Sequence, residues 1–313
     1  MRGRWYSPCE ALEELGQLGG ALGIAKDSRG GLAPLAVNLV DHGHVAQGMV
    51  DTHLEEVTRF ELRVDLQQAV SKVQGLLQPA GLDVVLNHAG DVLNGNLAMK
   101  MADKEGIKYK MILTHEDIAP GADAPAEDRR GLVGCCPLYK IVGAAAEAGK
   151  SLEEVFAIAE RFNNNMATLA VAMTTATHPS SGQAIFNLAD DEMEIGMGQH
   201  GEAGTGPCKI MTADATAEAM LSRLLPAIKA KQGDELMVLL NGSGATTLME
   251  LYILMRGVKK VVDAKGMKLA APVVGEWLTV QEMAGFQMFV AKLDAELLKY
   301  WKAPADSPAL TVC

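Results

Sequence analysis

Two glycine-containing loops carry most of the residues whose types could do chemistry. The first, residues 87–91 (NHAGD), follows an apolar run at 82–86. Glycine lets the backbone approach a ligand closely, and the carboxylate of Asp91 could accept a proton from a substrate hydroxyl. The same aspartate could instead cap the helix that the next residues predict, because capping aspartates are common. The sequence leaves both interpretations of Asp91 open.

The second loop, residues 192–204 (EMEIGMGQHGEAG), places His200 among four glycines, with Glu202 two residues later. Glycines cost backbone entropy on folding, so packing alone does not favour so many of them. A histidine in this setting could act as a general base, a nucleophile or a metal ligand. It could also be an ordinary hydrogen-bonded side chain, which is what a single histidine more often is.

The other candidates have weaker support. His42 and His44 stand two positions apart, and such positions face opposite ways on a strand, so they form a poor metal pair. The adjacent thiols of Cys135 and Cys136 have poor geometry for sharing one ion, and no metal site is predicted. Residues 241–251 (NGSGATTLMEL) could cradle a phosphate, but a glycine turn followed by a cap at Thr246 or Thr247 explains them about as well.

Composition limits what the whole chain can be. The 313 residues are 49% apolar and 21% charged, which is typical of a folded protein of one large or two medium domains. The formal charge of −11 gives no overall positive field to hold nucleic acid or anionic lipid. No apolar stretch approaches the length that a membrane span needs, and the first residues lack the apolar run of a secretory signal. We therefore expect a soluble, cytoplasmic protein that binds neither nucleic acid nor membrane.

Short apolar runs alternate with helical patterns along the chain, which is typical of α/β proteins. Helices are predicted at 66–77, 151–162, 212–231 and 247–264, and strands at 82–86, 107–113, 167–174, 235–240 and 268–274. We expect two α/β domains with mixed or mostly parallel sheets and flanking helices. The ligand cleft is expected between or beside the carboxyl ends of strands.

The boundary between these domains is predicted near residue 165, which gives an amino-terminal domain at 1–165 and a carboxy-terminal domain at 166–313. Residues 116–131 (EDIAPGADAPAEDRRG) predict a mobile surface loop. Ser151 and Glu154 predict a capping box, and Pro226 predicts a kink or break in its helix. Residues 1–60 have signals too weak to assign any element.

Seven segments resemble the dihydroxyacetone kinase family, specifically its substrate-binding subunit. They are NHAGDVLNGNLAMKMADKEGIK (87–108), RRGLVG (129–134), KIVGAAAEAGKSLEEV (140–155), DDEMEIGMGQHGEAG (190–204), LLNGSGATTLMELYI (239–253), VGEWLTVQEMAGF (274–286) and APADSPAL (303–310). They occur in the family's order and at family-like spacing, and the resemblance covers roughly residues 82–313.

The resemblance implies a homodimer of two-domain subunits with a small ketose bound in the cleft. What resembles the substrate-capturing histidine is His200, whose imidazole nitrogen in the family adds to the ketone carbon and forms a covalent carbinolamine. Asp91 resembles the residue that takes the proton from the terminal hydroxyl as phosphorus is attacked. Asn87, Gly90 and Gly201 belong to the same two loops and are expected to bind substrate.

The phosphoryl donor in the family is a nucleotide held by a separate helical subunit or by a carboxy-terminal domain. This chain ends just after the tail of the family's first domain. The resemblance therefore implies that no cofactor is bound tightly to this chain. ATP or ADP with magnesium is expected on a partner polypeptide, a helical nucleotide-binding kinase subunit.

One family loop departs from the pattern. The family has GGGSGHEP early in its first domain, and the histidine of that loop helps to hold the substrate. Here the region reads RGGLAPLAVNLVDHGHVAQGMVD (29–51), with Val37 near the expected position of the histidine. Either His42 or His44 replaces it, or this function is absent. Gln199 and Ala203 also stand where the family has isoleucine and proline around His200.

Three functions fit this pattern. The first is a kinase subunit for dihydroxyacetone or a related ketose such as erythrulose, and this is the function we expect. The second is a non-catalytic relative that binds the ketose and acts as a sensor or co-regulator, which the altered loop at 29–43 favours. The third is another reaction on a bound carbonyl compound, such as that of a lyase or an isomerase.

Overall fold

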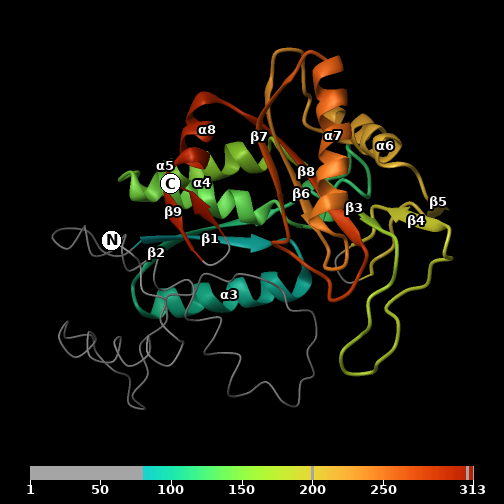
Figure 1. The fold of residues 1–313 in the computed structure, drawn as a ribbon. Helices are drawn as coiled ribbons and strands as arrows, with labels where there is room; N and C mark the ends of the chain where they lie inside the picture. Colours follow the sequence, from blue (N-terminus) through green and yellow to red (C-terminus); the bar gives the residue numbers. More distant parts are fainter. Residues whose placement is uncertain (1–79, 199–200, 308–309, 313) are drawn as a thin grey trace, which may run out of the picture. The chain divides into compact units, whose positions relative to one another are not determined.

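The computed structural model describes residues 80–198, 201–307 and 310–312, and Figure 1 shows their fold. All of them belong to Val37–Cys313, the larger of the two compact units into which contacts divide the chain. The boundary predicted near residue 165 lies inside this unit and stays a prediction. The helix predicted at 66–77 lies outside the described residues. Among the helices that are described, none is long and apolar enough to cross a membrane.

Strands and helices alternate through the described residues. In chain order they are β1 (Ala80–Leu86), α3 (Ala89–Lys104), β2 (Lys108–Thr114), the 3-10 helix η1 (Ala126–Asp128), α4 (Cys135–Glu147), α5 (Leu152–Asn163), β3 (Met166–Ala172), β4 (Glu192–Ile195), β5 (Pro207–Lys209), α6 (Ala213–Ala227), β6 (Glu235–Gly242), α7 (Leu248–Ala264), β7 (Lys268–Gly275), β8 (Gly285–Leu293), α8 (Ala295–Lys302), β9 (Ala305–Asp306) and β10 (Thr311–Val312). The five predicted strands are present as β1, β2, β3, β6 and β7. The α/β fold class is confirmed.

A parallel pair of strands, β1 and β2, carries helices on both faces. Side chains alternate along β1, so successive residues face opposite ways. Val84 belongs to a hydrophobic core that it shares with α4 and α5. Its neighbour Val85 lies against Gly95 of α3, so closely that a Cβ on this glycine would meet it at 2.8 Å. α3 therefore covers the face opposite to α4 and α5, as Figure 1 shows.

The larger sheet has six strands in the order β5-β4-β3-β8-β6-β7. Of its five strand pairs, β6–β7 is parallel and the other four are antiparallel. The sheet is therefore mixed, and the alternative of a mostly parallel sheet is wrong here. The difference comes from three strands that were not predicted: β8, which lies antiparallel between β3 and β6, and the antiparallel strands β4 and β5.

Two hydrophobic cores cover the two faces of this sheet. The alternation along β6 separates them, because Val238 and Leu240 pack with α6 and α7. Met237 and Leu239 face the other way and pack with α4, α5 and α8. Both β3 and β6 run antiparallel to β8, so they run in the same direction. The carboxyl ends of β3 and β6 therefore lie at the same end of the sheet.

The ends of two helices confirm predictions made from single residues. The hydroxyl of Ser151 accepts a hydrogen bond from the N–H of Glu154, and the Glu154 carboxylate accepts one from the N–H of Ser151 at 2.8 Å. This is the predicted capping box at the start of α5. Pro226 lies in the last turn of α6, which ends at Ala227, so the predicted break is present and terminates the helix.

Asp83 is a buried carboxylate in the middle of β1. This residue is 7% exposed, and neither oxygen of its carboxylate has a hydrogen-bond partner among the described residues. Burial raises the pKa of Asp83 from 3.8 to about 6, because the charged form loses its hydration. The folded state then binds the proton more tightly than the unfolded state. The stability that this provides is fully present below pH 4 and is lost as the pH rises through about 6.

Replacing Asp83 by asparagine is expected to raise the free energy of unfolding at pH 8 by about 1–2 kcal/mol, since a neutral amide costs less to bury than a carboxylate. The difference in the free energy of unfolding between variant and wild type should be about 1 kcal/mol smaller at pH 5, where Asp83 is mostly protonated. Urea unfolding at the two pH values measures both. Asp190→Asn, at an exposed position, is the control and should show no such gap. A gap that does not vary with pH would contradict a charged Asp83.

Candidate functional site

The loop after β1 delivers the first predicted residues to the amino-terminal end of α3. His88 takes the cap position of this helix, and its side chain makes no capping hydrogen bond. Asp91 lies in the first turn, where the helix dipole favours a negative charge. The interpretation of Asp91 as the helix cap is therefore wrong, because the helix begins at Ala89.

Two neighbours of Asp91 play different parts in this loop. The side-chain amide of Asn87 donates to the carbonyl of Ala126 at 3.3 Å and also to the carbonyl of Arg129. Asn87 thus ties the loop after β1 to the segment that leads into Arg130. Gly90 is exposed, and the space around a Cβ there would be open. The backbone of the first turn of α3 is therefore accessible at Gly90.

The loop at 196–204 folds back on itself through backbone hydrogen bonds. The N–H of Gly198 donates to the carbonyl of Glu202 at 2.8 Å, and the N–H of Gly201 donates to the carbonyl of Gly198 at 3.2 Å. Gly201 has a φ of 82°, and a Cβ on it would meet the side chain of Ile185 at 2.5 Å. This backbone conformation requires glycine at position 201, which explains why one of the four glycines is present despite its entropy cost.

Four candidate residues lie outside the described residues. They are His200, Gln199, His42 and His44. The roles of His200 as the capturing group and of His42 or His44 as a substitute for the family histidine stay predictions.

One side-chain contact joins the two loops that the sequence identified. His88 Nε2 lies 2.9 Å from Glu202 Oε1, although 114 residues separate them. The His88 side chain is 35% exposed and that of Glu202 is 34% exposed, so a ligand in solution can reach this contact. His88 precedes Asp91 by three residues, and Glu202 follows His200 by two. The contact therefore holds the chain next to Asp91 beside the chain next to His200.

Arg130 fastens the same loop from another direction. Its Nε donates to Asp117 Oδ2 at 2.6 Å, and one terminal nitrogen donates to the carbonyl of Gly196 at 3.0 Å. The other terminal nitrogen lies 3.9 Å from Glu202 Oε2. Burial raises the pKa of Asp117, although the Arg130 guanidinium opposes this shift. Arg130 therefore neutralises a buried carboxylate and holds both ends of the loop at 196–202.

Glu116 organises the segment that presents Arg130. This fully buried residue accepts hydrogen bonds at Oε1 from the N–H groups of Leu132 and Gly134, each at 2.8 Å. In the part of the chain that the structure describes, its Oε2 has no hydrogen-bond partner. Burial raises the pKa of Glu116 from 4.5 to about 7, although these N–H groups favour the charged form. A Cβ on Gly134 would meet the carboxylate at 2.6 Å. The turn into α4 is thus built around the Glu116 side chain.

Sequence reasoning missed Glu116, Asp117 and Arg130 as parts of the site. It predicted a mobile surface loop over 116–131, and this is wrong at the amino-terminal end, where Glu116, Asp117 and Ile118 are buried. The physical reason is that Arg130 pairs with Asp117 and two backbone N–H groups bind one oxygen of Glu116, which lowers the cost of burying the two acids. The available signal was a pair of adjacent acids shortly after the strand predicted at 107–113, with two arginines at the end of the same segment.

The possible phosphate cradle at 241–251 is a helix start. Thr247 caps α7 and forms a capping box with Glu250, whose carboxylate accepts the N–H of Thr247 at 2.9 Å. The preceding Thr246 accepts the N–H of Gly285 at 2.8 Å with its hydroxyl. The turn-and-cap interpretation is confirmed, with Thr247 as the cap.

Comparison with known proteins shows a family match over most of the chain. Residues 64–309 match the Dak1 domain family. The chain is 39% identical over 234 residues to PTS-dependent dihydroxyacetone kinase 1, dihydroxyacetone-binding subunit DhaK, of Listeria innocua serovar 6a, covering 74% of this chain and 71% of the relative. It is 33% identical over 294 residues to the L-erythrulose kinase of Pectobacterium atrosepticum, covering 93% of this chain and 49% of the relative.

Solved structures with a similar fold include proteins of dihydroxyacetone metabolism. The dihydroxyacetone kinase operon co-activator Dha-DhaQ superposes with a TM-score of 0.68 at 29% identity, covering 77% of this chain and 74% of that one. The dihydroxyacetone kinase from C. freundii in complex with AMP-PNP and Mg2+ has a TM-score of 0.65 at 24% identity, covering 79% of this chain and 45% of that one, and supports the fold. With a family match across most of its length, the chain belongs to the dihydroxyacetone kinase family, as a substrate-binding (K) subunit or domain.

Proposed function

We propose that this chain captures a short-chain ketose and presents its terminal hydroxyl for phosphorylation. The observation that carries the proposal is the 2.9 Å contact between His88 and Glu202, which sets the neighbours of Asp91 beside the neighbours of His200. In this proposal His200 adds to the keto carbon to form a carbinolamine, and Asp91 accepts the proton of the hydroxyl that attacks phosphorus.

The position of Asp91 suits a base. It lies in the first turn of the 16-residue helix α3, whose amino-terminal dipole stabilises the carboxylate at neutral pH. Phosphoryl transfer depends mostly on positioning and on neutralising charge. We assign the neutralisation of charge to magnesium, bound with ATP or ADP on a separate nucleotide-binding subunit. We also propose that this chain forms a homodimer. Dihydroxyacetone and erythrulose, named in the relatives, define the substrate class.

A reconstituted assay tests the proposal. The chain is mixed with a nucleotide-loaded partner subunit, magnesium and dihydroxyacetone, and the phosphorylated product is measured. His200→Ala is expected to lose both ketose capture and product, because no nucleophile then holds the keto carbon. His178→Ala is a matched control at a histidine with no predicted role, whose Nδ1 lies 3.0 Å from the hydroxyl oxygen of Ser180. Product formation that survives in His200→Ala would contradict the proposal.

A second candidate function is a ketose-binding co-regulator without kinase activity. The similarity to an operon co-activator, at 29% identity and a TM-score of 0.68, favours it. The same assay separates the two candidates. A co-regulator captures the ketose but yields no product under conditions in which an authentic dihydroxyacetone-binding subunit turns over with the same partner.

A further inference from the structure

The outer face of α3 carries an exposed row of apolar side chains. The helix packs against β1 through Gly95, which is buried and where a Cβ would meet the side chain of Val85 at 2.8 Å. Leu93 and Leu97 stand two residues before and after Gly95, so each projects about 200° around the helix from it, on the opposite face. Met101 lies four residues further along this face. The exposed fractions of Leu93, Leu97 and Met101, which we call the α3 stripe, are 70%, 57% and 40%.

The size of the α3 stripe indicates what kind of contact covers it. The sheet already covers the other face of the helix, and a helix with apolar residues on both faces is typical of one that is covered on both. The three side chains together expose roughly 300 Å², a size at which an apolar patch on a monomer is often functional. A stable interface takes about 800 Å² from each partner. The stripe therefore fits the apolar centre of an interface with a partner that binds and leaves, better than it fits a permanent dimer of this chain.

Two lysines border the stripe at the carboxyl end of α3. Lys100 and Lys104 are exposed, and each stands three residues after a member of the stripe, on the same side of the helix. The exposed acid between them in the sequence, Asp103, accepts a hydrogen bond from the hydroxyl of Tyr109 at 3.1 Å. Because the whole chain has a formal charge of −11, this positive border is a local feature. A surface that complements it has an apolar row bordered by aspartate or glutamate.

The other end of the stripe leads to Asp91. Leu93 follows Asp91 by two residues, so both belong to the first turns of α3 but project from opposite sides of the helix. Between these two sides, at the end of the helix, Gly90 is exposed, and a Cβ there would meet nothing within 4 Å. A polypeptide that lies along the stripe can therefore reach over the end of α3 to Asp91 without meeting a side chain at position 90.

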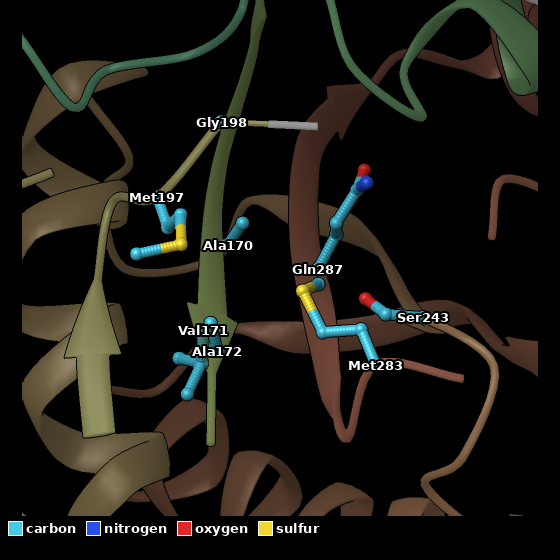
Figure 2. Close-up of a pocket in the computed structure, with 8 residues that line it drawn as sticks. All are labelled: Ala170, Val171, Ala172, Met197, Gly198, Ser243, Met283 and Gln287. Carbon is cyan, nitrogen blue, oxygen red and sulfur yellow. The ribbon is translucent and has the colours of Figure 1, made fainter. Parts of the chain in front are cut away.

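The pocket at the carboxyl ends of β3 and β6 offers no such approach (Figure 2). It is too narrow to admit even a group the size of a water molecule. The side chain of Gln287, which lines it, already accepts the N–H of Val133 at 3.0 Å with its Oε1. A phosphoryl group brought by another polypeptide cannot enter through this pocket, in contrast to the open end of α3 at Gly90.

We propose that the α3 stripe, with Lys100 and Lys104 beside it, is the surface on which the nucleotide-bearing partner subunit docks. The inference rests on the proposed function, in which this partner delivers the phosphoryl group to the hydroxyl that Asp91 deprotonates. The partner contributes a helix with an apolar row bordered by aspartate or glutamate. Docking along α3 sets the position of the phosphoryl donor relative to Asp91, because the stripe and this carboxylate belong to the same helix.

Isothermal titration calorimetry measures docking directly, with the nucleotide-loaded subunit of an authentic dihydroxyacetone kinase titrated into the full chain. Leu97→Gln is expected to raise the dissociation constant at least about tenfold, because an apolar side chain at the centre of the interface is lost. Lys104→Glu should raise it about threefold and make it less sensitive to salt, since an attraction at the border becomes a repulsion. Met249→Gln on α7 is the matched control, because Met249 is also 70% exposed, and it should leave the dissociation constant unchanged.

Further measurements on Leu97→Gln separate docking from chemistry. Turnover at a saturating concentration of the partner should stay within about twofold of wild type, because Leu97 lies more than one helical turn from Asp91. Ketose capture without the partner, followed by NMR of a ketose labelled with 13C at its keto carbon, should also be unchanged. Glutamine and leucine have similar helix propensities, so the free energy of unfolding should match that of wild type.

The results also identify any other occupant of the stripe. A much lower free energy of unfolding in Leu97→Gln would mean that another segment of this chain covers it. A change from dimer to monomer in sedimentation would mean that a second copy does. Either result overturns the proposal, as does an unchanged dissociation constant or a partner that does not bind the wild-type chain.

Failure of the proposed function gives a different result. If the partner binds the wild-type chain and binds Leu97→Gln more weakly, but no phosphorylated product forms with wild type, the docking surface stands and the kinase function falls. If product forms and Leu97→Gln needs no more partner than wild type does, the kinase function stands and the docking surface falls.

Discussion

Asp91→Asn is expected to lower turnover about 10³-fold while ketose capture stays within about twofold of wild type. An asparagine keeps the size and place of the side chain in the first turn of α3 but cannot accept a proton, and general bases contribute about 10²–10⁴-fold. Steady-state turnover with the nucleotide-loaded partner subunit measures the first quantity. Ketose capture is measured by NMR of a ketose labelled with 13C at the keto carbon, which follows the conversion of that carbon into a tetrahedral carbon.

The control for this experiment is an aspartate on the same helix. Asp103 lies in an exposed part of α3 and accepts a hydrogen bond from the hydroxyl of Tyr109 at 3.1 Å, so Asp103→Asn makes the same chemical change away from the site. It should keep full turnover. If Asp91→Asn loses capture in proportion to turnover, Asp91 holds the substrate and is not the base.

Arg130→Met is expected to lower the free energy of unfolding by about 3 kcal/mol and to abolish ketose capture. Asp117 is 1% exposed, and the loss of its partner at 2.6 Å leaves a buried charge without compensation. The carbonyl of Gly196 and the carboxylate of Glu202 lose their cation in the same step. Urea unfolding measures the free energy, and NMR of a ketose labelled with 13C at its keto carbon measures capture. Arg223→Met on α6 is the control for the loss of an arginine side chain.

A double variant isolates the ion pair from other effects of the substitution. Asp117→Asn removes the unpaired charge, so adding it to Arg130→Met should recover at least about 1 kcal/mol of stability. The loss in the single variant should also be larger at pH 8 than at pH 5. Without Arg130 the pKa of Asp117, already raised by burial, rises further, and protonation at the lower pH relieves the buried charge. No recovery in the double variant would show that Asp117 is not the partner that matters.

The elements that the sequence predicted well are those with a clear local pattern. β1 and β2 are short apolar runs between turn signals, and α5 and α7 begin with capping residues that identify their first turns. β8 was missed because it is buried almost throughout, so its residues show no alternation of polar and apolar side chains. Two of the four antiparallel pairs in the larger sheet involve β8, and the other two involve β4 and β5, which were not predicted either.

The candidate site divides in the same way. Its two loops were visible because polar residues stand among glycines in both, and the first of them follows a predicted strand directly. The contacts that connect them were not visible, since His88 and Glu202 are 114 residues apart and Arg130 and Gly196 are 66 apart. A sequence shows which residue types are present, but the pairing of distant side chains depends on how the sheets and helices pack.

The place of β8 has a consequence for how the protein is made. In the described six-stranded sheet, β8 (residues 285–293) lies between β3 and β6 and pairs with both. The ribosome adds β8 more than 40 residues after it has finished β6 at Gly242. A nascent chain arrested before β8 therefore has both halves of the ligand-binding edge but no strand to align them. The competence to bind a ketose is expected to arise late in synthesis, after β8 has left the exit tunnel.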